Sequence, residues 1–474
     1  MIKNNKATFF VIFVGLILSI LFSINGLNKH DKNKTTIDGN SYHQMIKADT
    51  FRYLSHGNEI KNQLNEGINF FKTGREHYTK YLPPRLIAAY YYFFDKDLFQ
   101  NSSKTIINEG IHLNYIIMQC LLYFFSITIL FLTLKNIFDK RICFFIFIFL
   151  SFEPTIFQYH GTFWSESIFF SFQIILISLI LQPKPNMGTF FFIGIFLAVL
   201  SLQKEYAIFY IIPVLLFLLF FLKDKKINNF ISLGIGFIIV QSVLGFNNYY
   251  RSGSFYIMPA TTKTDLHMIL VTNVVSKKLG IQPNEFEKNE GKAALSWINK
   301  NSIELNNKIN DKSFNSIEGR HLWALRDYIK NEVDKIKLDQ FIQKRTINFF
   351  AKYPSDFILE VMKNSVHVTL LNPFHIYSDH KYYSGEFYYN TSEHKELIKY
   401  RIIYTLIIYL ICLYGLYVLI KQKNFKVISY LILSILYFFA PISWHGNTRY
   451  FLPCYIYFSI FFGVGLNKLI TKII

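Results

Sequence analysis

Two carboxylates stand out by their position in the sequence. Asp49 and Tyr53 are four positions apart, so a short helix would carry both on one face. Glu166 lies at the start of an apolar stretch, where burial of a carboxylate without a partner is costly. Such a residue can take part in proton transfer, or it can cap a helix or bond to a backbone amide. A second Asp-x-x-x-Tyr pattern, Asp38 to Tyr42, leaves the choice of aspartate open.

Basic residues at the borders of apolar stretches form a second set. A lysine or arginine in such a position can hold an anion, or its long side chain can extend to the water interface. A histidine there can bind a metal ion, although hydrogen bonding alone is the more common use. The residues of this set are Arg85, Lys204, Arg251, His445 and Arg449.

Apolar stretches long enough to cross a bilayer run through most of the chain. The 474 residues are 51% hydrophobic and 18% aromatic. A bilayer span needs about 20 apolar residues, and most of these stretches lack the polar stripe of a soluble helix. We therefore predict an all-α polytopic membrane protein with about ten transmembrane helices and a helical extracytoplasmic region. The predicted spans are 8–27, 112–134, 142–158, 164–181, 188–202, 207–222, 228–246, 402–420, 427–443 and 450–470.

The net charge of +19 is distributed as in membrane proteins. With the N-terminus in the cytoplasm, every short connector on that side is net basic, as the positive-inside rule requires; 223–226 and 421–426 are examples. The first span has a basic start and no small-residue cleavage site after it, so we expect a signal anchor. We predict a multi-pass inner or plasma membrane protein with both termini in the cytoplasm and with membrane lipids, not nucleic acid, as partners.

Two long segments, 28–111 and 248–400, then lie outside. The predicted organisation is an N-terminal transmembrane module, 1–247, that includes the outer loop 28–111. An extracytoplasmic region, 248–400, and a C-terminal transmembrane module, 401–474, follow. All the cysteines lie in predicted spans, so we predict no outer disulfide; they are Cys120, Cys143, Cys412 and Cys454.

The first outer loop ends in Tyr81-Leu-Pro-Pro-Arg85, followed by an aromatic run at 90–94. Proline does not fit a helix interior, so Pro83 and Pro84 indicate a turn into a new helix from Arg85. This helix is amphipathic enough to lie in the membrane interface. The loop is therefore expected to fold back onto the membrane.

In their order along the chain, these motifs resemble those of the GT-C-type membrane glycosyltransferases. This group includes the protein O-mannosyltransferases and the lipid A aminoarabinose transferases. The resemblance covers most of the chain but departs from the family in two places: Asp49-Thr50 replaces an Asp-Glu pair, and Lys204-Glu205 replaces an arginine. Besides Asp49 and the Pro-Pro turn, it rests on Phe152-Glu-Pro-Thr155, Phe163-Trp-Ser-Glu-Ser167, Asn247-Asn-Tyr-Tyr-Arg-Ser-Gly253 and His445-Gly-Asn-Thr-Arg-Tyr450 with Pro453.

The resemblance implies a sugar transfer on the extracytoplasmic, or periplasmic, face. The donor would be a sugar on a polyprenyl phosphate or similar lipid carrier, and the acceptor a glycan, lipid or protein. Such a reaction needs a carboxylate that deprotonates the acceptor, cations that hold the departing phosphate, and an apolar groove for the lipid tail.

Residue roles follow from the resemblance. Asp49 would be the base and Glu166 a second catalytic carboxylate. The substrate-binding residues would be Tyr53, Arg85, Lys204, Arg251, His445 and Arg449. No cofactor and no metal ligand is assigned, although a divalent metal ion is left open because some members of the family use one.

Two other functions share part of this pattern. An O-antigen or polysaccharide polymerase or ligase also has many spans and a large late outer loop, but it lacks an essential aspartate in an early loop. A transporter or flippase for lipid-linked glycans would carry ionisable groups near the bilayer midplane. Here those groups cluster at the span ends and no inverted repeat is visible, which favours the glycosyltransferase.

Overall fold

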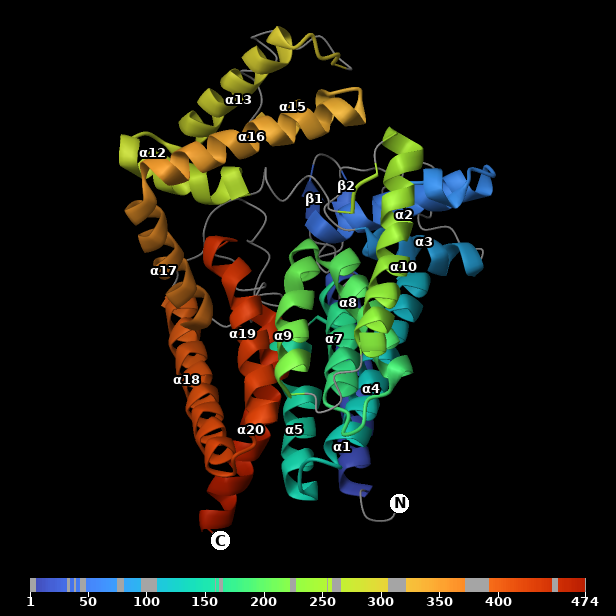
Figure 1. Cartoon of the computed structure of the whole chain (residues 1–474), viewed down its shortest axis with the longest axis vertical. Coiled ribbons are helices and arrows are strands. Elements are labelled where there is room, and N and C mark those ends of the chain that lie inside the picture. The colour runs from blue at the N-terminus through green and yellow to red at the C-terminus, as the bar shows by residue number, and fades with distance from the viewer. Residues whose placement is uncertain are drawn as a thin grey trace.

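The computed structural model of the chain describes residues 6–31, 35–37, 40–42, 48–74, 81–94, 109–157, 159–161, 165–221, 227–253, 255–257, 266–305, 321–370, 392–445 and 451–473. In this part of the chain the fold is helical, with long helices in one bundle and a group of helices above it (Figure 1). The predicted fold class is confirmed. The sequence did not predict the small antiparallel hairpin of β1 (Thr35–Ile37) and β2 (Asn40–Tyr42).

The first half of the bundle follows the predicted spans. Its helices are α1 (Lys6–Asp31), α4 (Glu109–Leu134), α5 (Lys140–Phe152), α7 (Glu166–Ile180), α8 (Met187–Gln203), α9 (Ile211–Phe221) and α10 (Ile227–Ser252). The predicted span 142–158 is interrupted, because Pro154 has no amide hydrogen and holds Glu153 in an extended conformation. A short helix, α6 (Pro154–Phe157), follows the break. The span predicted at 207–222 starts as the 3₁₀ helix η3 (Glu205–Tyr210) and continues as α9.

The second half of the bundle contains α18 (Ser392–Lys421), α19 (Phe425–His445) and α20 (Leu452–Ile473). Among the described residues, 5 helices are long and apolar enough to cross a membrane, and they lie within α1, α4, α10, α18 and α20. Helices α7 and α8, the stretch Glu205–Phe221 of η3 and α9, and the stretch Phe425–Ala440 of α19 are apolar but shorter. The chain is thus a multi-pass membrane protein, and the total of about ten spans stays a prediction.

Glycines set the closest helix contacts in this bundle. A Cβ atom at Gly194 of α8 would clash with the backbone of Leu233 in α10, and one at Gly236 would clash with Phe191. Small residues let neighbouring backbones approach each other in a membrane, where van der Waals packing holds helices together. Helix α8 also packs against α7. Helix α8 is therefore held between α10 and α7.

The segment predicted as the first outer loop forms α2 (Ala48–Asn65), the turn η2 (Phe70–Lys72) and α3 (Leu82–Phe93). The predicted Pro-Pro turn is present, but α3 begins at Leu82 rather than Arg85. The reason is that proline fits the first turn of a helix, where its missing N–H has no partner to lose. Helices α2 and α3 pack against each other.

The region after α10 forms a helical group at the top of Figure 1. It contains the π-helix η4 (His267–Val271), α12 (Thr272–Leu279), α13 (Pro283–Lys300), α15 (His321–Tyr328) and α16 (Glu332–Lys352). Two apolar clusters hold it together, one around Leu325 and one around Val275. Helix α17 (Pro354–Leu370) leads from this group toward the bundle. The predicted division at 247 and 400 stays a prediction.

The N-terminus and the C-terminus lie at the same end of the molecule, and the group of α12 to α16 lies at the other end (Figure 1). This arrangement agrees with the predicted placement of both termini on one side of the membrane. The assignment of that side to the cytoplasm stays a prediction.

Candidate functional site

The start of α7 and the end of α8 meet in a buried ion pair. Glu166 is the first residue of α7, and Lys204 directly follows α8. The Lys204 Nζ lies 2.7 Å from the Glu166 Oε1, and only 1% of each side chain is exposed. The ammonium also lies 5.6 Å from the centre of the Phe169 ring. Two residues that the sequence singled out separately therefore meet in one contact.

The local structure explains this pairing. A carboxylate in the first turn of a helix is favoured by the helix dipole, which suits Glu166. Helix α8 ends at Gln203, the backbone of Lys204 is extended, and the 3₁₀ helix η3 begins at Glu205. The neighbouring Gln203 donates a hydrogen bond of 3.0 Å from Nε2 to the Ser165 carbonyl oxygen. This hydrogen bond holds the two chain segments together next to the ion pair.

Glu153 is a second buried carboxylate, and the sequence analysis did not select it. It lies at the end of α5 with 3% exposure. The Glu153 Oε1 accepts a hydrogen bond of 2.5 Å from the Thr155 hydroxyl, and Oε2 accepts one of 2.6 Å from the Tyr404 hydroxyl of α18. The Glu-Pro dipeptide was the signal that could have found it, since proline ends a helix at the preceding residue.

The connection between α6 and α7 is also ordered by a polar contact in its described part. The Nδ1 atom of His160 lies 2.9 Å from the Ser167 hydroxyl oxygen, one residue beyond Glu166. The centre of the imidazole ring lies 4.2 Å from the centre of the Tyr123 ring on α4. Both buried carboxylates, Glu153 and Glu166, are therefore placed on chain that packing holds in position.

The described part of α2 is anchored beside this region. Tyr53 is 4% exposed and belongs to an apolar cluster with Ile87 of α3, Tyr115 of α4 and Ile168 of α7. Ile168 lies only two positions after Glu166. The backbone of Asp49 lies in α2 one helical turn before Tyr53, and the side chain of Asp49 lies outside the described residues.

Arg85 uses its guanidinium group on the backbone of the loop. It donates 3.0 Å and 3.3 Å hydrogen bonds to the carbonyl oxygens of Thr73 and Tyr81, and it stacks 3.6 Å from the centre of the Tyr81 ring. Burial, and to a lesser degree the nearby charge of Arg251, lower the pKa of Arg85 to about 10, while Tyr81 opposes this shift. These contacts suit a residue that positions the loop; its predicted contact with substrate stays a prediction.

Arg251 lies in the last turn of α10 and is half-buried. The same helix holds the loop through Asn247, whose Nδ2 donates a 2.8 Å hydrogen bond to the Phe71 carbonyl oxygen. Tyr250 adds a ring contact of 5.9 Å with Phe71. Arg251 thus lies close enough to Arg85 for its charge to act on that guanidinium group. The ion pair of Glu166 and Lys204 is formed by other helices.

The remaining predicted residues lie outside this description. Arg449 is not among the described residues, and the side chain of His445 is not described. The start of α20 is nevertheless placed, because Gln173 of α7 donates a 2.9 Å hydrogen bond to the Pro453 carbonyl oxygen. Within the described ranges, no group of at least 3 His, Cys, Asp or Glu side chains could hold a metal ion. A divalent metal ion stays open, because the side chain of Asp49 is not included.

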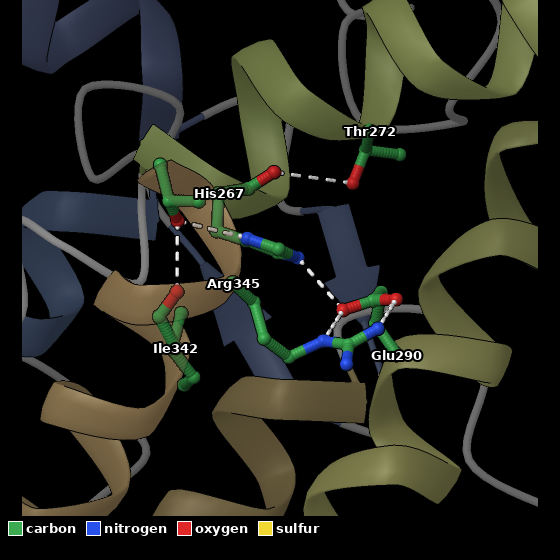
Figure 2. A network of polar contacts seen from close by, with 6 residues as sticks. His267, Thr272, Glu290, Ile342 and Arg345 are labelled. Atoms are coloured by element: carbon green, nitrogen blue, oxygen red, sulfur yellow. Dashed lines mark hydrogen bonds and ion pairs between the residues drawn. The ribbon is translucent and has the colours of Figure 1, made fainter. Parts of the chain in front are cut away.

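A second polar cluster lies in the outer helical group, away from these helix ends (Figure 2). Arg345 of α16 donates from Nε and a terminal nitrogen to the two oxygens of Glu290 in α13, each at 2.5 Å. His267 of η4 places Nε2 3.2 Å from the Glu290 Oε2 and Nδ1 2.9 Å from the Thr346 hydroxyl oxygen. Burial alone would raise the pKa of Glu290, but the hydrogen bonds of Arg345 and His267 lower it to about 2.

The contacts of this cluster join three elements of the group. The Thr346 hydroxyl donates its one hydrogen to the Ile342 carbonyl oxygen at 2.9 Å, so it accepts from His267 Nδ1. Glu290 pairs with Arg345 and lies beside His267, so the cluster connects η4, α13 and α16. Thr346 is buried at 4% exposure, so the group holds helices together rather than meeting a substrate.

Residues 98–246 match the model of the family described as "Dolichyl-phosphate-mannose-protein mannosyltransferase". The matched stretch includes Glu153, Glu166 and Lys204, whereas Asp49 and Arg449 lie outside it. No curated protein matches the chain.

The chain is also similar to solved structures of an archaeal protein from Archaeoglobus fulgidus. One is the oligosaccharyltransferase AglB in complex with an inhibitory peptide and a dolichol-phosphate, with a TM-score of 0.49 and 14% identity over 100% of this chain and 51% of that chain. Another is the oligosaccharyltransferase in complex with Zn and sulfate, with a TM-score of 0.47 and 11% identity over 97% and 49%. The chain thus spans about half the length of these structures. The family match bears out, over residues 98–246, the resemblance to GT-C-type membrane glycosyltransferases.

Proposed function

We propose that the chain transfers a sugar from a polyprenyl-phosphate-type lipid carrier to an acceptor on the extracytoplasmic face of the membrane. The observation that carries this proposal is the family match over 98–246, the stretch that contains the buried pair of Glu166 and Lys204. A buried ion pair at the end of an apolar helix is expensive to maintain, which favours a functional role. The bundle around it supplies the apolar surroundings that a lipid carrier needs.

Asp49 is the proposed base. It lies on α2, whose next turn is anchored by Tyr53 beside the outer end of α7. The competing pattern ends at Tyr42, which belongs to strand β2, so the helical spacing of Asp-x-x-x-Tyr does not apply there. Asp49 takes the proton of the acceptor as the new glycosidic bond forms. The bond between the sugar carbon and the phosphate oxygen breaks, and the lipid phosphate leaves as an anion.

Cations at the outer helix ends hold the departing phosphate in this proposal. An ammonium has three N–H donors, so Lys204 can contact Glu166 and a phosphate oxygen together. Arg251, and Arg449 before α20, add arginine forks that suit bidentate phosphate contact. Glu166 keeps Lys204 ordered and charged before the donor arrives.

The test uses the full-length protein in liposomes with polyprenyl-phosphate sugars as donors. Asp49→Asn keeps the shape of the side chain and removes its basicity, so transfer should fall by about a hundred- to ten-thousand-fold. Donor binding and thermal stability should be unchanged. Asp38→Asn is the matched control, because it alters the aspartate of the competing pattern, and it should transfer normally.

Two outcomes contradict the proposal. Loss of transfer in Asp38→Asn alone would show that the reaction is assigned correctly and the base wrongly. Wild-type protein that moves the lipid-linked sugar across the membrane, but forms no glycosidic bond with any acceptor, would show a flippase.

A further inference from the structure

Helix α17 carries an exposed apolar stripe along one side. Ile358, Leu359, Met362 and Val366 are each more than half exposed, and their spacing places them on one face of the helix. The opposite side is covered, because Phe357 and Val361 pack into the outer apolar cluster around Val275. One face of α17 is thus accounted for, and the other needs an apolar partner.

The two ends of α17 lie in different surroundings. Near its start, Lys277 Nζ lies 2.8 Å from Glu360, and Lys278 Nζ lies 3.3 Å from Asp356, in ion pairs with α12. Near its end, the Tyr409 hydroxyl of α18 donates a 2.6 Å hydrogen bond to the Thr369 carbonyl oxygen. Charged side chains of α12 therefore contact the first half of α17, and the membrane helix α18 contacts its last turn.

The position of Tyr409 along α18 indicates how deep the C-terminal end of α17 lies in the membrane. Tyr409 lies seven residues after Ile402, the outer end of the apolar window of α18. At about 1.5 Å per residue, this is roughly 10 Å into the span. Side chains lean toward the N-terminus of their helix, so the Thr369 carbonyl lies somewhat nearer the outer surface than the Tyr409 backbone. Helix α17 also packs along α19, another helix of the bundle.

We propose that the C-terminal half of α17 enters the outer leaflet of the bilayer and that its exposed stripe contacts lipid hydrocarbon. The neighbouring helix α18 also has an exposed apolar side, since Ile403, Ile407 and Leu410 are more than half exposed. The hydroxyls of Ser365 and Thr369 donate to helix carbonyl oxygens one turn earlier, as expected where water is absent. The region 248–400 is then not wholly extracytoplasmic: it is anchored in the membrane through α17.

The proposal predicts a gradient of depth along one helix, which spin labelling can measure. Single-cysteine variants Ile358→Cys, Met362→Cys and Val366→Cys are labelled with a nitroxide in liposomes. The native cysteines are all buried. Collisions with oxygen, which concentrates in hydrocarbon, should increase from position 358 through 362 to 366, and collisions with a water-soluble nickel chelate should decrease.

Two exposed leucines serve as references. Leu410→Cys on α18 should report hydrocarbon, and Leu279→Cys at the end of α12 should report water. Position 366 should approach the value at 410. Equal values at the three α17 positions that match position 279 would overturn the proposal. Protection of all three from both reagents would also overturn it, because it would show that protein, such as a second copy of the chain, covers the stripe.

Discussion

Glu166 and Lys204 are buried to the same extent, so neither charge can be removed alone without consequence. Their partnership explains why the bundle tolerates two ionisable side chains among apolar helices. The same pair is proposed to hold the donor, so structural and catalytic roles overlap at these two residues.

A double variant separates these roles. Lys204→Met leaves the buried carboxylate of Glu166 without this partner and should destabilise the protein by about 3–5 kcal/mol. The double variant Glu166→Gln/Lys204→Met removes both charges and should recover most of the thermal midpoint in detergent. Sugar transfer should stay lost, because the cation is absent. Recovery of transfer together with stability would show that the pair only supports the fold.

Glu290 should control the acid stability of the outer helices. Its pKa is about 2 in the folded protein, below the ordinary value of 4.5. A lowered pKa adds stability that is fully present above 4.5 and is lost as the pH falls toward 2. Glu290→Gln should therefore weaken α13 and α16 at neutral pH by on the order of 3 kcal/mol, measured by hydrogen exchange. The difference from wild type should shrink between pH 4.5 and 2.

The control for this variant is Glu304→Gln. Glu304 pairs with Lys330 at 3.3 Å, but both side chains are exposed, at 76% and 66%. An exposed pair contributes about 1 kcal/mol or less. If both variants behaved alike, the buried cluster would not stabilise this region.

At the scale of elements, the contact of α8 with α10 decides where Lys204 lies. Gly236→Ala places a Cβ against the backbone of Phe191 and should push the two helices apart, at a cost of about 1–3 kcal/mol. Gly234→Ala in the same helix meets no atom within 4 Å and is the matched control. We expect a lower thermal midpoint and reduced transfer only in the first variant. Normal transfer in Gly236→Ala would show that this helix contact does not position the site.

The α5–α6 break shows how one element serves the site. Pro154 ends α5, and Glu153 is left at the break, where the Thr155 hydroxyl and the Tyr404 hydroxyl can reach its carboxylate. A continuous helix would have pointed these groups in other directions. The interruption of a predicted span is therefore the feature that places this buried carboxylate within reach of α18.

At the scale of the whole molecule, the topology can be tested with two exposed lysines at opposite ends. Lys300 ends α13 in the outer helical group, and Lys423 lies between α18 and α19. A thiol reagent that does not cross membranes should label Lys300→Cys in intact cells. It should label Lys423→Cys only after permeabilisation, because the basic connectors are predicted to be cytoplasmic. Equal labelling of both in intact cells would refute the orientation.

The sequence by itself determined the membrane class and the approximate course of the helices. These properties depend on local hydropathy, and a bilayer requires backbone groups to bond within each helix. The Pro-Pro turn before α3 and the choice of Glu166 as a candidate also followed from local rules, because proline and an isolated carboxylate have strong effects wherever they occur.

Only the tertiary structure decided which side chains meet. Lys204 pairs with Glu166, Tyr404 with Glu153, and Arg345 with Glu290, across separations that no helical periodicity describes. A contact between distant segments depends on how whole helices pack, and local hydropathy contains no information about the neighbour that a helix will find.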